Sequence, residues 1–194
     1  MAIQVLPAAL ERFDDVATML APARPDVPAC WCLANRLGGR DQKALAGGEG
    51  RREYVRGLCA RAVPPGVLAY SGGEVVGWCG VAPRAELHAF RRGGLVPWPG
   101  EDAVWSVFCF KVRGGHRRQG VAGALLAGAM ELARANRAPA VEGYPMDNAG
   151  ARVSSTLGFV GTRSMFEKAG FTKVADTQKV AAGIPRVLMR LELA

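Results

Sequence analysis

Apolar and polar positions along the chain follow two different periods, which predict a mixture of helices and strands. An apolar residue at every third or fourth position predicts helices over residues 8–20, 52–63 and 121–135. Thr162 as N-cap and Gly170 as C-cap predict a further short helix that runs to Ala169. Short apolar runs predict strands over residues 3–6, 67–70, 75–81, 105–112, 139–144, 171–175 and 186–193. This order of elements is typical of an α/β or α+β fold in which helices cover a sheet. A length of 194 residues favours one domain, spanning residues 1–194.

The strand over residues 105–112 has the strongest pattern in the chain. Its alternating positions form two faces, Trp105, Val107, Cys109 and Lys111 on one and Ser106, Phe108, Phe110 and Val112 on the other. Both faces are largely apolar, and such a strand is normally central and covered from both sides. Residues 38–50, by contrast, are rich in Gly and polar residues, and we expect them to be irregular and mobile.

Basic residues gather between this strand and the helix at 121–135, at Arg113, His116, Arg117 and Arg118. The first N–H groups of a helix lack internal partners and carry the positive end of the helix dipole. Gly120 has no Cβ and would let an anion approach the backbone closely. The pattern indicates a phosphate or pyrophosphate site, with a plain strand–helix turn bearing solvated arginines as the alternative. It matches neither a P-loop nor the Gly-x-Gly-x-x-Gly dinucleotide fingerprint.

The net charge raises the question of an anionic partner. A formal charge of +8 favours nucleic acid, a membrane surface or a phosphorylated cofactor. Apart from the group at residues 113–118, the basic residues are dispersed along the chain, and aromatic residues do not interleave with them, so we expect no nucleic-acid partner. No apolar run approaches the ~20 residues that span a bilayer, and we expect no membrane partner. Residues 1–5 lack the features of a signal peptide, which leads us to expect a cytoplasmic location.

The cysteines are odd in number and scattered, at Cys30, Cys32, Cys59, Cys79 and Cys109. In a cytoplasmic protein we expect them to be free thiols rather than a disulfide framework. The triplet Cys30-Trp31-Cys32 is shorter than the Cys-x-x-Cys of a zinc knuckle, and no second pair follows at metal spacing. We therefore expect no metal.

The segment after the central strand resembles a known family signature. Val112-x4-Arg117-Arg118-Gln119-Gly120-Val121-Ala122 is similar to the acetyl-CoA signature, Arg/Gln-x-x-Gly-x-Gly/Ala, of the GNAT superfamily of N-acetyltransferases. Residues 166–171, Phe-Glu-Lys-Ala-Gly-Phe, resemble the family's later Tyr-x-Lys-x-Gly-Phe element. With the order of elements, the resemblance covers about residues 3–193. It implies a mixed, mainly antiparallel central sheet, flanked by helices, whose central strands splay apart.

The resemblance implies acetyl-CoA as cosubstrate and assigns its contacts. The pyrophosphate would lie near Arg117 and Arg118, against the backbone amides of Gln119, Gly120, Val121, Ala122 and Gly123. Pantetheine would pair as a pseudo-strand with backbone groups of Phe110 and Val112. This role gives a physical reason for the splayed strands, because unpaired main-chain groups are otherwise costly.

The implied reaction is direct transfer of the acetyl group to a primary amine of an unidentified small molecule or protein. The backbone N–H of Phe110 is the natural oxyanion donor. Where the family often has an acidic Tyr, this chain has Phe166. Either the thiolate leaves unassisted, which a thiol pKa near ~8.5 permits, or another residue serves. Tyr144 is the first candidate for the acid and Glu142, on the same strand face, for the base.

These catalytic candidates have structural alternatives. Tyr144 could end its strand as an aromatic plug, and Glu142 could be the partner of an arginine. Glu101 and Asp102, which precede the central strand, are weaker candidates for the base.

The family often builds its acceptor pocket after the first helix, where Trp31, Cys32 and Arg36 lie. The alternative for Trp31 and Cys32 is the buried core, where these residue types are common. The alternative function is a non-catalytic acyl-CoA-binding or regulatory module with the same fold, which Phe166 keeps open. A homodimer is expected by analogy with the fold alone.

Overall fold

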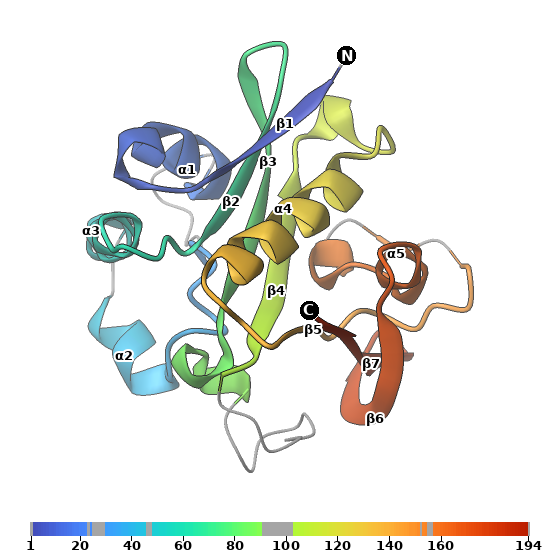
Figure 1. The fold of residues 1–194 in the computed structure, drawn as a ribbon. Coiled ribbons are helices and arrows are strands. Elements are labelled where there is room, and N and C mark those ends of the chain that lie inside the picture. The colour runs from blue at the N-terminus through green and yellow to red at the C-terminus, as the bar shows by residue number, and fades with distance from the viewer. Residues whose placement is uncertain are drawn as a thin grey trace.

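A seven-stranded sheet forms the centre of the molecule (Figure 1). The computed structural model describes residues 2–22, 24, 30–45, 48–90, 103–151, 153–154 and 157–193. The strands are β1 (Ile3–Pro7), β2 (Gly66–Ser71), β3 (Glu74–Pro83), β4 (Trp105–Val112), β5 (Ala140–Gly143), β6 (Thr172–Ala181) and β7 (Ile184–Glu192). Their spatial order is β1-β2-β3-β4-β5-β7-β6, and all neighbours are antiparallel except β4 and β5. This confirms the predicted mixed, mainly antiparallel sheet.

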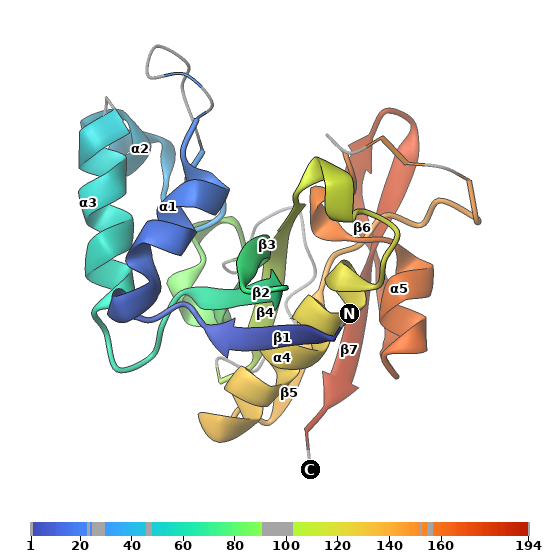
Figure 2. The same ribbon diagram turned by 90° about the horizontal axis from the view of Figure 1, so that it is seen from above.

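Helices cover both faces of the sheet (Figure 2). They are α1 (Phe13–Leu20), α2 (Gly39–Ala44), α3 (Gly48–Cys59), α4 (Val121–Ala135) and α5 (Arg163–Lys168). Trp78 of β3 packs with Val16 of α1 and Val55 of α3. The next residue, Cys79, faces the opposite side and packs with Leu125 of α4. No helix in the described ranges is long and apolar enough to cross a membrane.

Some element boundaries differ from the predictions. The segment 38–50, expected to be irregular, contains α2 and the start of α3, which ends at Cys59. Because α3 buries only Val55 and Cys59, its first turns carry no apolar periodicity. Strand β6 extends past residue 175 to Ala181, since it pairs with β7 through a tight turn at Ala182 and Gly183, where φ is +49° and +76°. Strands from both ends of the chain share the sheet, and the single-domain extent stays a prediction.

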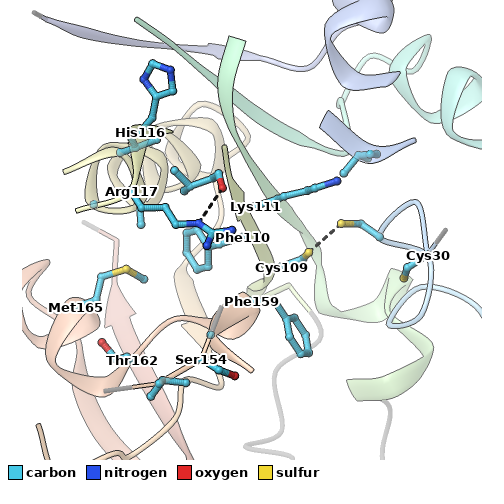
Figure 3. Close-up of a pocket in the computed structure, with 18 of the residues that line it drawn as sticks. Cys30, Cys109, Phe110, Lys111, His116, Arg117, Ser154, Phe159, Thr162 and Met165 are labelled. Atoms are coloured by element: carbon cyan, nitrogen blue, oxygen red, sulfur yellow. Dashed lines mark hydrogen bonds between the residues drawn. The ribbon is translucent and has the colours of Figure 1, made fainter. Parts of the chain in front are cut away.

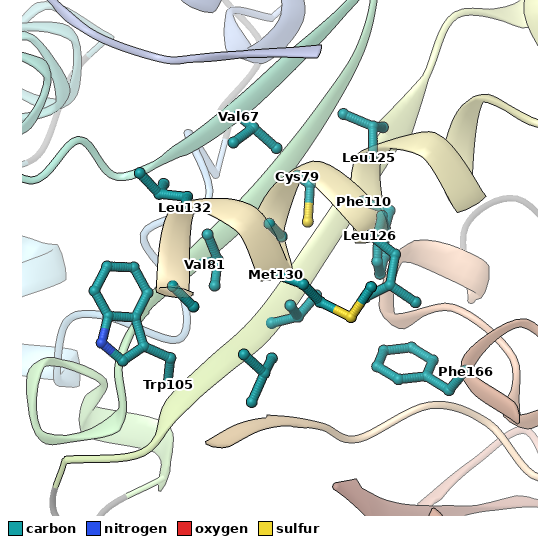
Figure 4. Packing of buried hydrophobic residues seen from close by; sticks show 14 of the residues in the cluster. Val67, Cys79, Val81, Trp105, Phe110, Leu125, Leu126, Met130, Leu132 and Phe166 are labelled. Carbon is teal, nitrogen blue, oxygen red and sulfur yellow. The ribbon is translucent and has the colours of Figure 1, made fainter. Parts of the chain in front are cut away.

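Helix α4 packs very closely on the sheet (Figure 4). A Cβ at Gly77 of β3 would lie 2.8 Å from Val121 Cγ1 and 2.9 Å from Leu125 Cδ1. A Cβ at Gly128 of α4 would overlap the side chain of Val5 of β1. Glycines at these contacts thus set how near α4 lies to β1 and β3, and they hold its first turn against the centre of the sheet.

A β-bulge interrupts the alternation of β4. The register with β3 shifts between Val107 and Cys109, so that Phe108 has no directly opposite residue. Val107 and Phe110 therefore both pack on the α4 face, whereas Phe108 and Cys109 pack on the other face. The predicted faces, which placed Cys109 with Val107 and Phe108 with Phe110, are wrong for this reason.

Strands β4 and β5 pair over only part of their length. Trp105 to Val107 pair with Val141 to Gly143, where β5 ends, while β4 continues to Val112. Residues 108–112 therefore keep β3 on one side and have no β5 residue beside them on the other. This confirms the predicted splay of the central strands.

Candidate functional site

A cavity of about 900 Å³ opens where β4 and β5 diverge. Its walls are the second half of β4, the first turn of α4, described residues between 20 and 35, and the segment that leads into α5. Figure 3 shows Phe110 at its centre, with Thr162 and Met165 on one side and Cys30 on the other. The cavity therefore joins the centre of the sheet to both flanking segments.

The second half of β4 presents backbone groups without a strand partner to this cavity. The N–H of Arg113 donates to the carbonyl of Val76 on β3 at 2.9 Å. Successive residues of a strand point their N–H and C=O groups to opposite edges. Because the N–H of Arg113 points to β3, the backbone N–H and C=O of Lys111 also point to β3. Those of Phe110 and Val112 point to the opposite edge, where β5 has ended. In agreement, the carbonyl of Val112 accepts a hydrogen bond from Arg117 Nε at 3.4 Å.

The first turn of α4 adds a second set of free backbone groups. Gly120 precedes the helix with φ of +82°, a left-handed conformation that favours glycine. The N–H of Ala124 closes the first turn on the carbonyl of Gly120 at 3.0 Å, so the N–H groups of residues 121–123 have no partner within the helix. The Gln119 side chain braces the loop through a 3.0 Å bond to the carbonyl of Gly115.

The charge of the cavity is positive. Lys111, His116, Arg117 and Arg118 line it, and no Asp or Glu is among its described lining residues. A second hollow of about 1020 Å³ adjoins the same loop and is lined by Gly114, Gly115, Arg117, Arg118 and Gln119 among others. Together the two hollows suit a long ligand with an anionic end near the start of α4.

All residues predicted to contact the cofactor border these hollows. Gln119 lines the second hollow, and the cavity is lined by Phe110, Val112, Arg117, Arg118, Gly120, Val121, Ala122 and Gly123. The structure thus brings them together, while their contact with a bound ligand stays a prediction.

The residues predicted for the acceptor pocket separate into two groups. Trp31 and Cys32 line the cavity, and both also pack in or against the core under α1 and α3. Arg36 is 7% exposed and does not line it. Its guanidinium instead donates to the carbonyl of Pro65 at 3.1 Å and lies 3.4 Å from Glu86. These contacts connect Arg36 to neighbouring segments of the fold, and its role in acceptor binding stays a prediction.

The predicted acid and base lie beside the cavity rather than in its lining. Glu142 is fully buried, 2.7 Å from Arg84 Nη1 and 3.4 Å from Arg190 Nη1. Tyr144 donates to the same carboxylate at 3.3 Å, and its ring stacks on Phe90 with centroids 4.5 Å apart. Burial raises the pKa of Glu142, which the two arginines oppose. The geometry matches the alternative of an arginine partner, and the catalytic roles stay predictions.

Phe166, which stands where the family often has a Tyr, is a core residue. It is fully buried and contacts the Phe110 ring edge-on, with centroids 6.3 Å apart. A Cβ at Gly143 of β5 would overlap its ring, so the ring packs directly against the face of β5 at that glycine. The weaker base candidates Glu101 and Asp102 lie outside the described residues.

Other lining residues had no signal in the sequence. Asn35 donates its side-chain N–H to the carbonyl of Phe108 at 3.4 Å, beyond the pairing with β5. Cys109 reaches the cavity through the β-bulge, which simple alternation does not predict. Ser154 comes from a segment whose sequence carries no periodicity, and Thr162 is predicted only as the start of a helix.

Comparisons with known proteins agree with this geometry. The acetyltransferase (GNAT) family matches residues 42–159, whereas curated proteins show no significant match. An acetyltransferase of the GNAT family from Streptococcus pneumoniae is similar over all of both chains, with a TM-score of 0.59 and 13% identity. An N-acetyltransferase from Staphylococcus aureus Mu50 covers 99% of both chains, with a TM-score of 0.56 and 13% identity.

A third structure contains a ligand. The PaiA N-acetyltransferase from Thermoplasma acidophilum, in complex with coenzyme A, is similar over all of both chains, with a TM-score of 0.54 and 11% identity. At these identities the structural likeness shows the fold, and the sequence match over residues 42–159 shows the family. The chain therefore belongs to the acetyltransferase (GNAT) family, whose enzymes use acetyl-CoA.

Proposed function

We propose that this chain binds acetyl-CoA in the cavity and transfers the acetyl group directly to a primary amine of a small molecule or protein. The observation that carries the proposal is the meeting, in one cavity, of the unpaired half of β4 with the free amides of α4. The coenzyme A in the Thermoplasma acidophilum relative supports the same ligand for this chain.

The residues present fit the parts of this ligand. The N–H groups of residues 121–123 and the charges of Arg117 and Arg118 suit the pyrophosphate. The backbone groups of Phe110 and Val112 suit the pantetheine amides, since they face the space that a continued β5 would fill. Apart from the Val112 carbonyl, which accepts from Arg117 Nε, these groups have no strand or helix partner in the described part of the structure, so binding would satisfy them.

Acetyl-CoA supplies an activated thioester, and the chain would act on it through backbone N–H groups and through the positive charges that line the cavity. The N–H of Phe110 would donate to the thioester oxygen as negative charge develops there. The positive lining would lower the pKa of a bound amine, because a second cation is unfavourable beside Lys111. The neutral amine then attacks the carbonyl carbon, and the carbon–sulfur bond breaks. The nitrogen loses one proton as the amide forms, and the CoA thiolate takes up one proton to become the free thiol. A thiol pKa near ~8.5 lets that thiolate leave unassisted.

Calorimetry and a turnover assay test the two halves of the proposal. We expect acetyl-CoA and CoA to bind with micromolar affinity and ATP to bind much more weakly, at two salt concentrations. A panel of primary amines should then release free CoA thiol above the rate of hydrolysis. Lack of binding by either CoA species would overturn the cofactor assignment.

Gly120→Glu tests the position of the pyrophosphate. The substitution adds a negative charge at the start of α4 and places a side chain on a residue with left-handed backbone conformation. We therefore expect at least a tenfold loss of acetyl-CoA affinity. Gly57→Glu in α3 is the matched control. A Cβ at Gly57 would meet no atom within 4 Å, and Gly57 does not line the cavity. Equal affinities for the two variants would contradict the site.

A second candidate is a non-catalytic acyl-CoA-binding or regulatory module. It is favoured by the buried Phe166 and by the lack of a carboxylate among the described lining residues. Tight CoA binding without thiol release across the amine panel would support it. A cytoplasmic location and a homodimer stay predictions.

A further inference from the structure

Two thiols meet at the wall of the cavity. Cys32 Sγ donates a hydrogen bond to Cys109 Sγ across 2.8 Å, although the residues are 77 positions apart (Figure 3, dashed line at Cys109). Both line the cavity, and neither belongs to the predicted cofactor contacts. The established family membership assigns no role to this pair.

Unusual backbone on both sides brings these thiols together. Trp31 and Cys32 have φ of +50° and +55°, a left-handed turn that non-glycine residues rarely adopt. On the other side, the β-bulge turns Cys109 away from α4 and toward this turn. Regular geometry on β4 would have placed Cys109 on the α4 face, out of reach of Cys32.

We propose that Cys32 and Cys109 are a site of reversible oxidation, at which a peroxide converts the two thiols into a disulfide. The sulfurs need less than about 1 Å of further approach, because a disulfide joins sulfurs about 2.05 Å apart. The cavity gives a small oxidant direct access to both. This proposal does not rest on the binding of acetyl-CoA.

The reaction balances with hydrogen peroxide as the oxidant. One thiol releases its proton, and the thiolate attacks a peroxide oxygen. The oxygen–oxygen bond breaks, a sulfenic acid forms, and the departing hydroxide takes up the released proton as water. The second thiol then attacks the sulfenic sulfur, which forms the sulfur–sulfur bond and releases a second water. Two thiols lose two electrons and two protons, and one peroxide becomes two waters. A dithiol reductant reverses the step by exchange.

The other cysteines are placed differently. Cys59 and Cys79 are 1% and 0% exposed and do not line the cavity. Cys30 is exposed and lines the cavity, but its sulfur accepts a hydrogen bond from the N–H of Ala34 at 3.4 Å rather than contacting another thiol. Cys30 is therefore the natural control for general oxidation of exposed thiols.

The disulfide would tie the turn at residues 30–37 to β4 at the residue before Phe110. That turn forms the wall of the cavity opposite Thr162 and Met165. Oxidation would therefore hold the turn at residues 30–37 at a fixed distance from β4.

Mass spectrometry of the full chain tests the proposal. After treatment of the reduced protein with hydrogen peroxide, we expect a loss of about two mass units, two fewer alkylatable thiols under denaturing conditions, and a Cys32–Cys109 cross-linked peptide in a non-reducing digest. Dithiothreitol should restore all thiols. The peptide map of the unmodified sequence decides the pairing without any variant.

Variants provide the matched comparison. Cys32→Ser and Cys109→Ser should each abolish the cross-link, whereas Cys30→Ser should retain it. A cross-link between another pair of cysteines would overturn the proposal. So would a protein in which peroxide oxidises Cys30 while Cys32 and Cys109 stay alkylatable.

Discussion

At the scale of single residues, Gly120 shows most directly how one side chain shapes the site. A Cβ at this position would meet nothing within 4 Å, so space does not require glycine. The requirement comes from φ of +82°, which turns the chain from the basic loop into α4 and leaves the first amides of the helix pointing outward.

Gly120→Ala should therefore lower the free energy of unfolding by about 1–2 kcal/mol, because alanine is strained in the left-handed region. Gly57→Ala, at an equally open position inside α3, should instead raise it by about 0.5–1 kcal/mol. Urea denaturation of both variants checks the difference. Stabilisation by both substitutions would show that φ at Gly120 is not restrictive.

The buried pair of Arg84 and Glu142 gives a second prediction at this scale. Removing one partner leaves a buried charge, so Arg84→Met and Glu142→Leu should each cost about 3–5 kcal/mol, and the double variant less than their sum. Chemical denaturation measures all three. A Glu142→Gln variant that keeps its unfolding free energy but loses at least a hundredfold in kcat would instead identify Glu142 as the base.

At the scale of elements, the site depends on two opposite features of the sheet. β4 and β5 separate after Val107, which exposes the backbone that would bind the cofactor. On the other side of β4, β3 and α4 approach so closely that Gly77 is required between them. The separation creates the cavity, and the close packing holds the helix end at its edge.

Gly77→Ala should move the first turn of α4, because its Cβ would lie 2.8 Å from Val121 and 2.9 Å from Leu125. We expect a loss of about 1–3 kcal/mol in stability and a weaker affinity for acetyl-CoA. Urea denaturation and calorimetry measure these effects, with Gly57→Ala as the control. An unchanged affinity in a destabilised Gly77→Ala variant would show that the helix end tolerates this shift.

At the scale of the whole molecule, ionic contacts connect segments that lie far apart in the chain. Glu86 in the 3-10 helix after β3 accepts two 2.8 Å hydrogen bonds from Arg61 and lies 3.4 Å from Arg36. These contacts join the turn after Leu33 to the residues that follow α3 and to the 3-10 helix that follows β3. The hydrogen bonds from Arg61 lower the pKa of Glu86 below its usual value of 4.5.

This contact predicts how stability depends on pH. A carboxylate with a lowered pKa stabilises the fold above its unfolded-state pKa, and that stabilisation is lost as pH falls through the folded-state value. Glu86→Gln should cost about 1–2 kcal/mol at pH 7 and progressively less below pH 4.5. Denaturation at several pH values checks this. Glu131→Gln, in an exposed pair with Arg134, should change stability little, and a similar loss in both would contradict the prediction.

Several features of this protein follow from its sequence alone. The apolar β4, the basic loop, Gly120 and the apolar stripe of α4 are contiguous, and each depends on preferences of residues close in the chain. The order of elements and the family signature therefore identified the fold, and they predict the residues that would contact the cofactor. The first turns of α3 were missed because they bury no apolar residue. The end of β6 was missed because pairing with β7, rather than apolar periodicity, defines it.

Tertiary structure decided the features that depend on contacts between residues far apart in the chain. The bulge that brings Cys109 to Cys32 depends on the register between β3 and β4, and the sequence of residues 105–112 does not predict it. Arg84 meets Glu142 from 58 positions away, and Arg36 turns to Glu86 instead of the cavity. These contacts depend on how the complete sheet and its covering helices pack, because charged groups must find partners wherever burial places them.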